Sequence, residues 1–409
     1  MRPTWLLALL ATLAGSAHAA PMTFEAALKL ADQSAPNLEA RAADVRAARL
    51  SAVAAGRLPD PKLAFGVEGF PISGPDAGHP ERNDFSDVRV GVMQDVPNGA
   101  KRRAARDRAT ADIGAAEVGG AAEGRNVRLS TALAWIDLYY AEQRLATLDD
   151  VSRALAPLRG TAASRLASGA ARPGETLQPE QWTAALADRR AALVANLAKA
   201  RAELVRWTGQ LEPEVAGSPP DYPIDPVALR AGLDDLPALR VYDARARQAD
   251  ADVAAAKADK RPDTSWELAY QRRDPRFGDM VMAQVTVSLP LFASTRQNPI
   301  IAARAQTAAR VRTEREGARR ELLAALDSSL ADHVMHHEQL MRASDTLVPL
   351  AKQRADLESA SYAAGTASLS DVLSALLAFA EARTDVVDRQ ADAARDAVRI
   401  ALTFGAQAQ

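Results

Sequence analysis

The strongest constraint on the fold is an internal duplication. Short motifs from the first half of the 409-residue chain recur in the same order in the second half, with small shifts in spacing that loop insertions would produce. The matched pairs are Pro36–Leu38 with Pro237–Leu239, Pro61 with Pro262, Phe65 with Trp266, Val92 with Val285, Gly169 with Gly365, Leu177 with Leu373 and Gly209 with Gly405. We therefore predict a first structural repeat over residues 20–209, a linker over 210–236 and a second repeat over 237–409.

Each half has the same pattern of helix, strand, loop, strand, long helix, turn and helix. In the first half, an alanine-rich helical stretch over residues 23–56 ends before Pro59. Alternating apolar and polar residues then predict four strands, because side chains in a strand point to opposite faces in turn. The predicted strands cover residues of about 63–70, 85–96, 264–271 and 280–290.

Long helices dominate the rest of the sequence. Residues 100–168 contain little that breaks a helix apart from glycines and Pro157, and such a helix would be about 100 Å long. The low aromatic content of 5% and the many alanines favour helices packed closely side by side. The fold class that we predict is mainly α with a membrane β-barrel, built from a duplicated unit of one strand pair and one long helical hairpin.

The strands leave two interpretations open. One apolar face and one mostly polar face over about ten residues are typical of a membrane β-strand whose other face lines water, and also of a soluble amphipathic sheet. Four strands cannot close a barrel, and an open sheet in lipid would leave its edge N–H and C=O groups unsatisfied. If the chain crosses a membrane, several copies must therefore share one barrel, and a trimer would form a matching ring of helical hairpins.

The N-terminus resembles an export signal. Arg2 precedes the apolar run Trp5–Ala14, and Ala17-His18-Ala19 follows as a small-x-small cleavage site, so we predict a signal peptide over residues 1–19. The alternative is a buried N-terminal helix. The sequence has no cysteine, which excludes disulfides and thiolate sites, and its net charge of −2 argues against a general nucleic-acid binder.

Several motifs give the chain a family resemblance. The stretch Tyr362–Leu373, its divergent first copy Leu166–Leu177, and Leu204–Gly209 resemble the TolC-type outer-membrane efflux factors. The motifs Leu58–Pro61, Gln94–Pro97 and Asp137–Glu142 resemble the heavy-metal branch of that family, which serves cobalt–zinc–cadmium and copper–silver efflux. The resemblance covers nearly all of the chain after residue 19.

The resemblance implies a homotrimer in outer-membrane lipid, with one shared β-barrel and an α-helical tunnel in the periplasm. It also implies two partners, a periplasmic adaptor and an inner-membrane pump, for which the chain is a passive, gated exit duct without a cofactor. One alternative is a type I secretion duct of the same fold. The others are a periplasmic adaptor, which would have a single hairpin among nested β-domains, and a soluble coiled-coil scaffold, which would need no alternating strands.

The two helical turns provide the first candidate sites. Gly169 and Gly365 occupy equivalent turns, and each can simply end a helix as a C-cap glycine. The family resemblance implies instead that these turns, with Thr366, dock the adaptor. Both functions are compatible with one turn.

A constriction is the second candidate. Glu175 and Asp371 lie at matching places beyond the glycines, and a ring of such acids would favour cations. The alternative is that each acid stabilises a helix N-terminus. Tyr362 is retained from the family's gate, whereas Ala367 and Ser374 replace an arginine and an aspartate that often occur there, so the familiar tip lock is not expected.

The only histidine cluster is the third candidate. His333 and His337 lie one helical turn apart and can present two imidazoles to one copper or zinc ion. The alternative, which we favour, is a solvated polar helix face. No Ser-His-Asp set, P-loop or dinucleotide fingerprint occurs in a convincing context, and we predict that the chain is not an enzyme.

Overall fold

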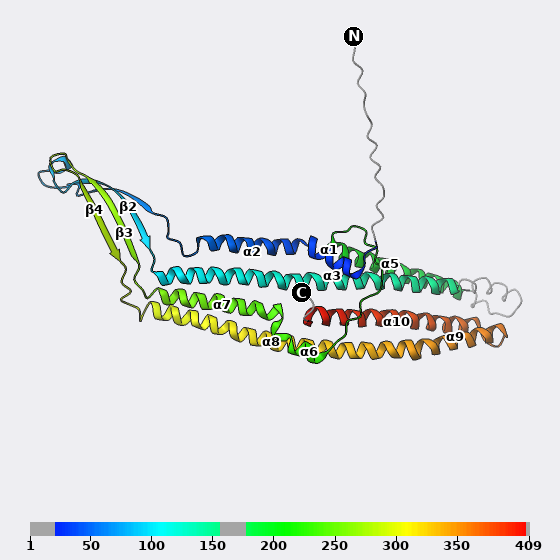
Figure 1. The fold of residues 1–409 in the computed structure, drawn as a ribbon. Helices are drawn as coiled ribbons and strands as arrows, with labels where there is room; N and C mark the ends of the chain where they lie inside the picture. Colours follow the sequence, from blue (N-terminus) through cyan, green and yellow to red (C-terminus); the bar gives the residue numbers. More distant parts are fainter. Residues whose placement is uncertain (1–20, 156–176, 406–409) are drawn as a thin grey trace, which may run out of the picture. The chain divides into compact units, whose positions relative to one another are not determined.

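The computed structural model describes residues 21–155 and 177–405, which form long helices and one sheet (Figure 1). They divide into two compact units, and each combines segments from both halves of the chain. Of the described residues, the helical unit comprises 21–35, 126–155, 177–225 and 328–405, and the sheet unit comprises Pro36–Arg125 and Pro226–Asp327. The predicted signal peptide lies outside the described residues.

The first helical stretch is two helices rather than one. Helix α1 covers Phe24–Ser34 and helix α2 covers Pro36–Ala54, so the prediction of a continuous stretch over 23–56 is wrong. Between them Ala35 is extended, with ψ of 119°. Proline disfavours the helical conformation in the residue before it and lacks the N–H that a continuing helix needs, so the chain breaks at Pro36.

The four predicted strands are confirmed. They are β1 (Lys62–Glu68), β2 (Asp87–Val96), β3 (Thr264–Arg272) and β4 (Met280–Val287), and they form one antiparallel sheet in the order β1-β2-β3-β4. The β1–β2 loop contains the 3₁₀ turn η1 (Pro80–Arg82). The middle pair joins the two halves of the chain, because β2 pairs with β3.

The long helices are also confirmed where they are described. Helix α3 (Gly99–Leu155) has 57 residues and is about 85 Å long. The part of the prediction beyond Leu155 lies outside the described residues up to 176. The other helices are α5 (Gln178–Thr208), α7 (Pro237–Ala258), α8 (Gln297–Arg342), α9 (Val348–Ala363) and α10 (Leu369–Phe404). The predicted linker contains helix α6 (Pro226–Ala231) and the 3₁₀ turn η3 (Leu233–Asp235).

A π-helical turn, η4, separates α8 from α9. It covers Ala343–Leu347, and the Val348 amide donates to the Ala343 carbonyl five residues back. Pro349 follows directly and cannot donate an amide hydrogen to the preceding turn. The wider turn lets the helix continue past this proline.

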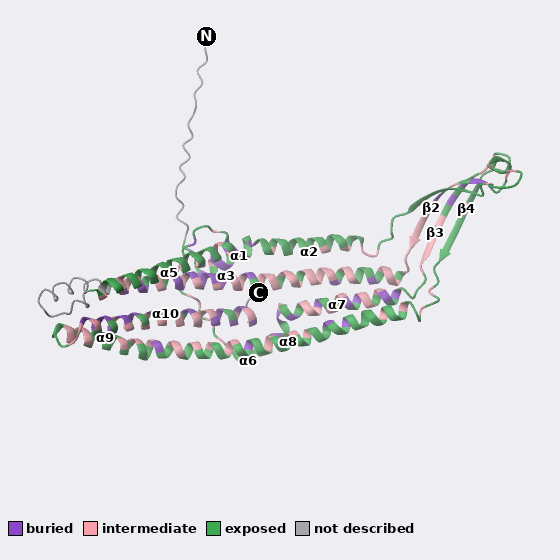
Figure 2. Ribbon diagram, turned by 180° about the vertical axis from the view of Figure 1, so that it is seen from behind, coloured by how far each residue is buried: buried purple, intermediate pink, exposed green. Residues whose placement is uncertain are grey.

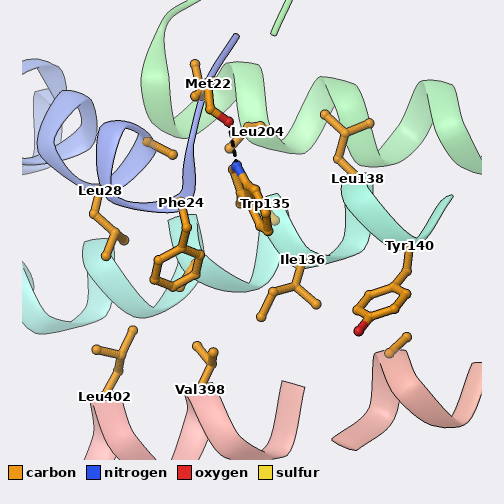
Figure 3. Packing of buried hydrophobic residues seen from close by; sticks show 14 residues of the cluster. Met22, Phe24, Leu28, Trp135, Ile136, Leu138, Tyr140, Leu204, Val398 and Leu402 are labelled. Atoms are coloured by element: carbon orange, nitrogen blue, oxygen red, sulfur yellow. Dashed lines mark hydrogen bonds between the residues drawn. The ribbon is translucent and has the colours of Figure 1, made fainter. Parts of the chain in front are cut away.

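The helical unit has an aromatic core, shown in Figure 3. Trp135 of α3 is fully buried, and its ring meets Phe24 of α1 edge to face at 5.6 Å between centroids. The Trp135 indole N–H donates to the Met22 carbonyl at 2.9 Å. Val398 and Leu402 of α10 complete the contact, so segments from both ends of the chain share one core.

Exposure differs strongly between elements. Figure 2 shows buried residues along α10, whereas β4 is almost entirely exposed. Among the residues that the structure describes, no helix is both long and apolar enough to cross a membrane.

Candidate functional site

The turn between α9 and α10 contains the described part of the predicted docking tip. Gly365 has φ of +77°, a left-handed conformation that residues with a β-carbon adopt only at a cost. The Gly365 amide donates to the Tyr362 carbonyl, and the Thr366 amide donates to the Ser361 carbonyl at 2.9 Å. This bonding pattern is a Schellman motif, which satisfies the last carbonyls of α9.

Thr366 strengthens the same turn with its side chain. Its hydroxyl donates to the Ser361 carbonyl at 3.0 Å, so amide and hydroxyl of one residue bind the same oxygen. The turn therefore has a fixed backbone shape. Gly169, its predicted counterpart, lies outside the described residues.

Asp371 caps the next helix. The Ser368 amide donates to the Asp371 carboxylate at 3.1 Å, and the Asp371 amide donates to the Ser368 hydroxyl, which forms a capping box at the start of α10. Hydrogen bonds from the Ser368 side chain and backbone lower the pKa of Asp371. The carboxylate is exposed and stays anionic. Glu175, its predicted counterpart, lies outside the described residues.

Tyr362 lies at the edge of an apolar cluster rather than in open solvent. It packs against a buried group from α3 and α10, with Trp182 and Leu186 of α5 nearby. The buried members are Val151, Leu369, Leu373, Leu377 and Ala380. The turn is thus held against three helices of the helical unit.

The two predicted histidines lie together on α8. The ring centroids of His333 and His337 are 6.4 Å apart, and burial lowers the pKa of His333. The Nδ1 atom of His333 is buried without a hydrogen-bond partner among the described residues. Within the same part of the chain, no group of three or more histidine, cysteine or acidic side chains is arranged to hold a metal ion.

The neighbouring His336 makes the contact that sequence reasoning missed. Its Nδ1 lies 2.6 Å from the carboxylate of Asp396, which is on α10 and largely buried. This contact joins α8 to α10. Three arginine–aspartate pairs join α3 to α10: Arg144 with Asp388, Arg383 with Asp150, and Arg395 with Asp137. The partners are far apart in sequence, so no local pattern indicates them.

One face of the sheet is apolar and exposed. The register aligns Phe65 with Val90, Val90 with Tyr270, and Tyr270 with Val281, so apolar side chains of all four strands share that face. Phe65 is 72% exposed and Val281 is 70% exposed. Further exposed members of the face are Leu63, Val67, Val88, Val92, Trp266, Leu268, Val285 and Val287.

The opposite face of the sheet is mostly polar. Arg89 forms an ion pair with Glu267 across the β2–β3 pair, and its guanidinium is 3.7 Å from Glu68 on β1. Gly91 lies between Arg89 and Glu267, and a β-carbon there would be 3.1 Å from the Glu267 carboxylate. The absence of a side chain at Gly91 makes room for this pair.

Comparison with known proteins agrees with this geometry. A family model described as outer membrane efflux protein matches residues 230–406, which include β3, β4 and the α9–α10 turn. The match covers less than half of the chain. No curated protein matches the chain.

Solved structures extend the likeness to the whole fold. A membrane protein from Pseudomonas aeruginosa has a TM-score of 0.79 and 16% identity, covering 93% of this chain and 90% of its own. The outer membrane protein VceC from Vibrio cholerae has a TM-score of 0.76 and 19% identity, covering 93% and 96%. The Campylobacter jejuni outer membrane channel CmeC has a TM-score of 0.77 and 14% identity, covering 93% and 85%. At these identities the likeness establishes the fold, which includes the half outside the family match.

Proposed function

We propose that the chain is the outer-membrane channel subunit of a tripartite efflux pump. The observation that supports this most is the exposed apolar face of the sheet, opposite a face with the charged residues Glu68, Arg89 and Glu267. A two-sided sheet of this kind suits lipid on one face and a water-filled lumen on the other. The efflux family match over 230–406 points in the same direction.

The sheet alone is incomplete as a membrane structure. Strands β1 and β4 are the two ends of the strand order, so each has one edge without a partner strand in the described chain. In hydrocarbon an unpaired edge costs several kcal/mol per polar group. We propose that three chains join β4 to β1 of the next copy, which closes one barrel of twelve strands from four per chain.

The helices of the two structural repeats, 20–209 and 237–409, would then line a periplasmic tunnel. We propose that the tunnel ends in the Gly169 and Gly365 turns, and that these turns, with Thr366, dock a periplasmic adaptor. The fixed Schellman geometry at Gly365 supports this, because a rigid tip costs less entropy to bind. The inner-membrane pump would act through that adaptor.

The acids beside the tips would set ion preference. We propose that Asp371 and Glu175, with Tyr362 packed behind the turn, line the narrowest part of the tunnel. Asp371 stays charged because hydrogen bonds lower its pKa, so it can attract cations while it also caps α10. Capping and selectivity are therefore compatible at this residue.

Conductance tests the constriction. The double variant Glu175→Gln with Asp371→Asn should lower cation preference in planar-bilayer recordings, and the effect should fade with salt because the screening length is about 10 Å at 0.1 M. The single variant Asp327→Asn, in the sheet unit, is the control for an acid away from the turn. An unchanged reversal potential in the double variant would leave capping as the only function of the acids.

Localisation tests the function as a whole. The full-length protein should fractionate with the outer membrane as a heat-modifiable trimer with an N-terminus near residue 20. Deletion of the gene should raise sensitivity to the exported compound, and the cloned gene should restore resistance. A monomer in the soluble periplasmic fraction would contradict the proposal and favour the scaffold or adaptor.

The exported substrate is a separate proposal. The motifs Leu58–Pro61, Gln94–Pro97 and Asp137–Glu142 favour metal cations, and the His333–His337 pair offers two imidazoles on α8. Metal-sensitivity assays with a wild-type gene and a His333→Gln, His337→Gln variant test both points. Restored export of a protein substrate instead of metal resistance would identify the type I secretion duct.

A further inference from the structure

A polar cavity lies where the sheet meets the helices of the sheet unit. Its volume is about 320 Å³. The charged and amide side chains that line it are Lys101, Asp259, Arg261, Asp263, Arg296 and Gln297. They come from the start of α3, the segment before β3 and the segment around the start of α8, so the cavity is at the helix-side end of the strands.

The charges in this cavity are unevenly paired. Lys101 binds both carboxylates, at 2.9 Å from Asp259 and 2.5 Å from Asp263. The guanidinium groups of Arg261 and Arg296 have no ion-pair or hydrogen-bond partner among the described residues. Both guanidinium groups can therefore form charge-assisted hydrogen bonds with an anion in the cavity.

An unsatisfied acceptor lies in the same cavity. The side-chain oxygen of Gln297 is buried and has no hydrogen-bond partner within the described chain. A buried acceptor without a donor costs about 1–3 kcal/mol. The cavity therefore combines two guanidinium groups without partners and one acceptor without a donor.

Exposed apolar side chains lie on the cavity and next to it in sequence. Leu289 lines the cavity and is 64% exposed, and Leu291 and Phe292, which follow it between β4 and α8, are 76% and 68% exposed. This segment directly follows Val287, the last residue of β4, which is exposed on the apolar face of the sheet. Ile300 on α8 lines the cavity and is exposed as well.

We propose that this cavity binds the headgroup of an amine-bearing membrane phospholipid such as phosphatidylethanolamine. The phosphate lies between Arg261 and Arg296, the ammonium donates to the Gln297 oxygen, and the acyl chains cover Leu289, Leu291 and Phe292. The proposal rests on the proposed outer-membrane location, since the sheet's apolar face must lie in lipid for the cavity to lie at a headgroup layer. It adds a specific lipid contact on the periplasmic side of that membrane.

Lipid titration of the purified full-length protein tests the site. Native mass spectrometry in detergent should show retained phosphatidylethanolamine. The variant Arg261→Ala with Arg296→Ala should bind it about tenfold more weakly or worse, since charged hydrogen bonds are lost. The matched control, Arg103→Ala with Arg247→Ala, removes two exposed helix arginines outside the cavity and should bind like wild type.

Two further probes identify the ligand chemistry. Phosphatidylcholine keeps the phosphate but has no N–H, so Gln297→Leu should abolish the preference for phosphatidylethanolamine over phosphatidylcholine without weakening phosphatidylcholine binding. Glycerophosphoethanolamine lacks acyl chains and should not compete. Equal competition by this soluble probe would overturn the lipid as source, and unchanged affinity in the double arginine variant would overturn the site.

Separate readouts distinguish this proposal from the proposed function. Thermal unfolding of the double arginine variant should match wild type, which excludes misfolding as the cause of lost lipid. If wild type is absent from the outer membrane, the proposed function fails. If wild type is present there and the arginine variants bind lipid normally, only the lipid site fails. Cross-linking between copies through an Arg296→Cys variant would show that a second chain covers the cavity, which would also overturn it.

Discussion

The Gly365 turn allows a sharp test of tip rigidity, through the variant Gly365→Ala. A β-carbon at Gly365 would meet no atom within 4 Å, so the substitution creates no clash. Its whole cost comes from the φ of +77°, at which a non-glycine residue loses about 1–2 kcal/mol. The penalty falls on the folded turn between α9 and α10, and the long helices keep their contacts.

Hydrogen exchange followed by mass spectrometry measures this penalty. A loss of 1–2 kcal/mol in local stability raises the open population about 5–30-fold, so amides of residues 361–368 should exchange faster by that factor. Gly365→Asn should show a smaller effect, because asparagine tolerates the left-handed region better than alanine does.

A second glycine provides a control, because its replacement by alanine should raise local stability where the Gly365 variant lowers it. Gly317 lies within α8, its φ is not positive, and a β-carbon there would also meet nothing within 4 Å. Gly317→Ala should therefore stabilise its helix by about 0.5–1 kcal/mol and slow local exchange. Exchange in residues 361–368 that is no faster in Gly365→Ala than in wild type would refute the assignment of the turn's rigidity to this backbone conformation.

Three further predictions concern contacts of the helical unit. Because the pKa of Asp371 is lowered in the folded protein, its helix cap is fully formed above a pH of about 4. The stabilisation by this cap is lost as the pH falls through the folded-state pKa. Hydrogen exchange in the turn should therefore accelerate at low pH in wild type but not in Asp371→Asn. Trp135→Phe removes one of the two donors to the Met22 carbonyl, which keeps its bond from the Ala216 amide, and should cost about 0.5–1.5 kcal/mol in denaturant unfolding; a smaller loss than Tyr139→Phe would contradict this. A double-mutant cycle on Arg395 and Asp137 should give a coupling of about 0.5–1 kcal/mol, since both side chains are partly exposed; a coupling of zero would mean the pair contributes nothing.

Local patterns predicted the strands and the turn well. Period-two alternation placed β1 to β4 within a few residues of their observed ends, because side chains on a strand must alternate between faces. Gly365 was predicted as a helix-ending glycine, and its φ of +77° confirms that part. The break between α1 and α2 has a local signal as well, since Pro36 disfavours the helical conformation in the residue before it.

Contacts between distant segments could not be predicted in the same way. The periodicity of a helix shows which residues share a face, but it does not show which side chain of another helix lies opposite. Asp396 is paired with His336 rather than with His333 or His337, and the cavity with Arg261 and Arg296 joins segments from different parts of the chain. Such pairs depend on packing, which a single sequence does not specify.

The π-helical turn Ala343–Leu347 determines which face of α9 each following side chain occupies. Ala343, the first residue of the turn, and Ala355 within α9 are both buried. The extra residue of the π-turn brings these two side chains onto the same face of the helix. Deleting a single residue from this turn would restore regular α-helical bonding, yet it would rotate the rest of α9 by about 100°. Ala355 and Tyr362 would then point elsewhere, so a one-residue deletion here should be more damaging to the tip than many substitutions. Insertions and deletions in this segment should therefore be poorly tolerated.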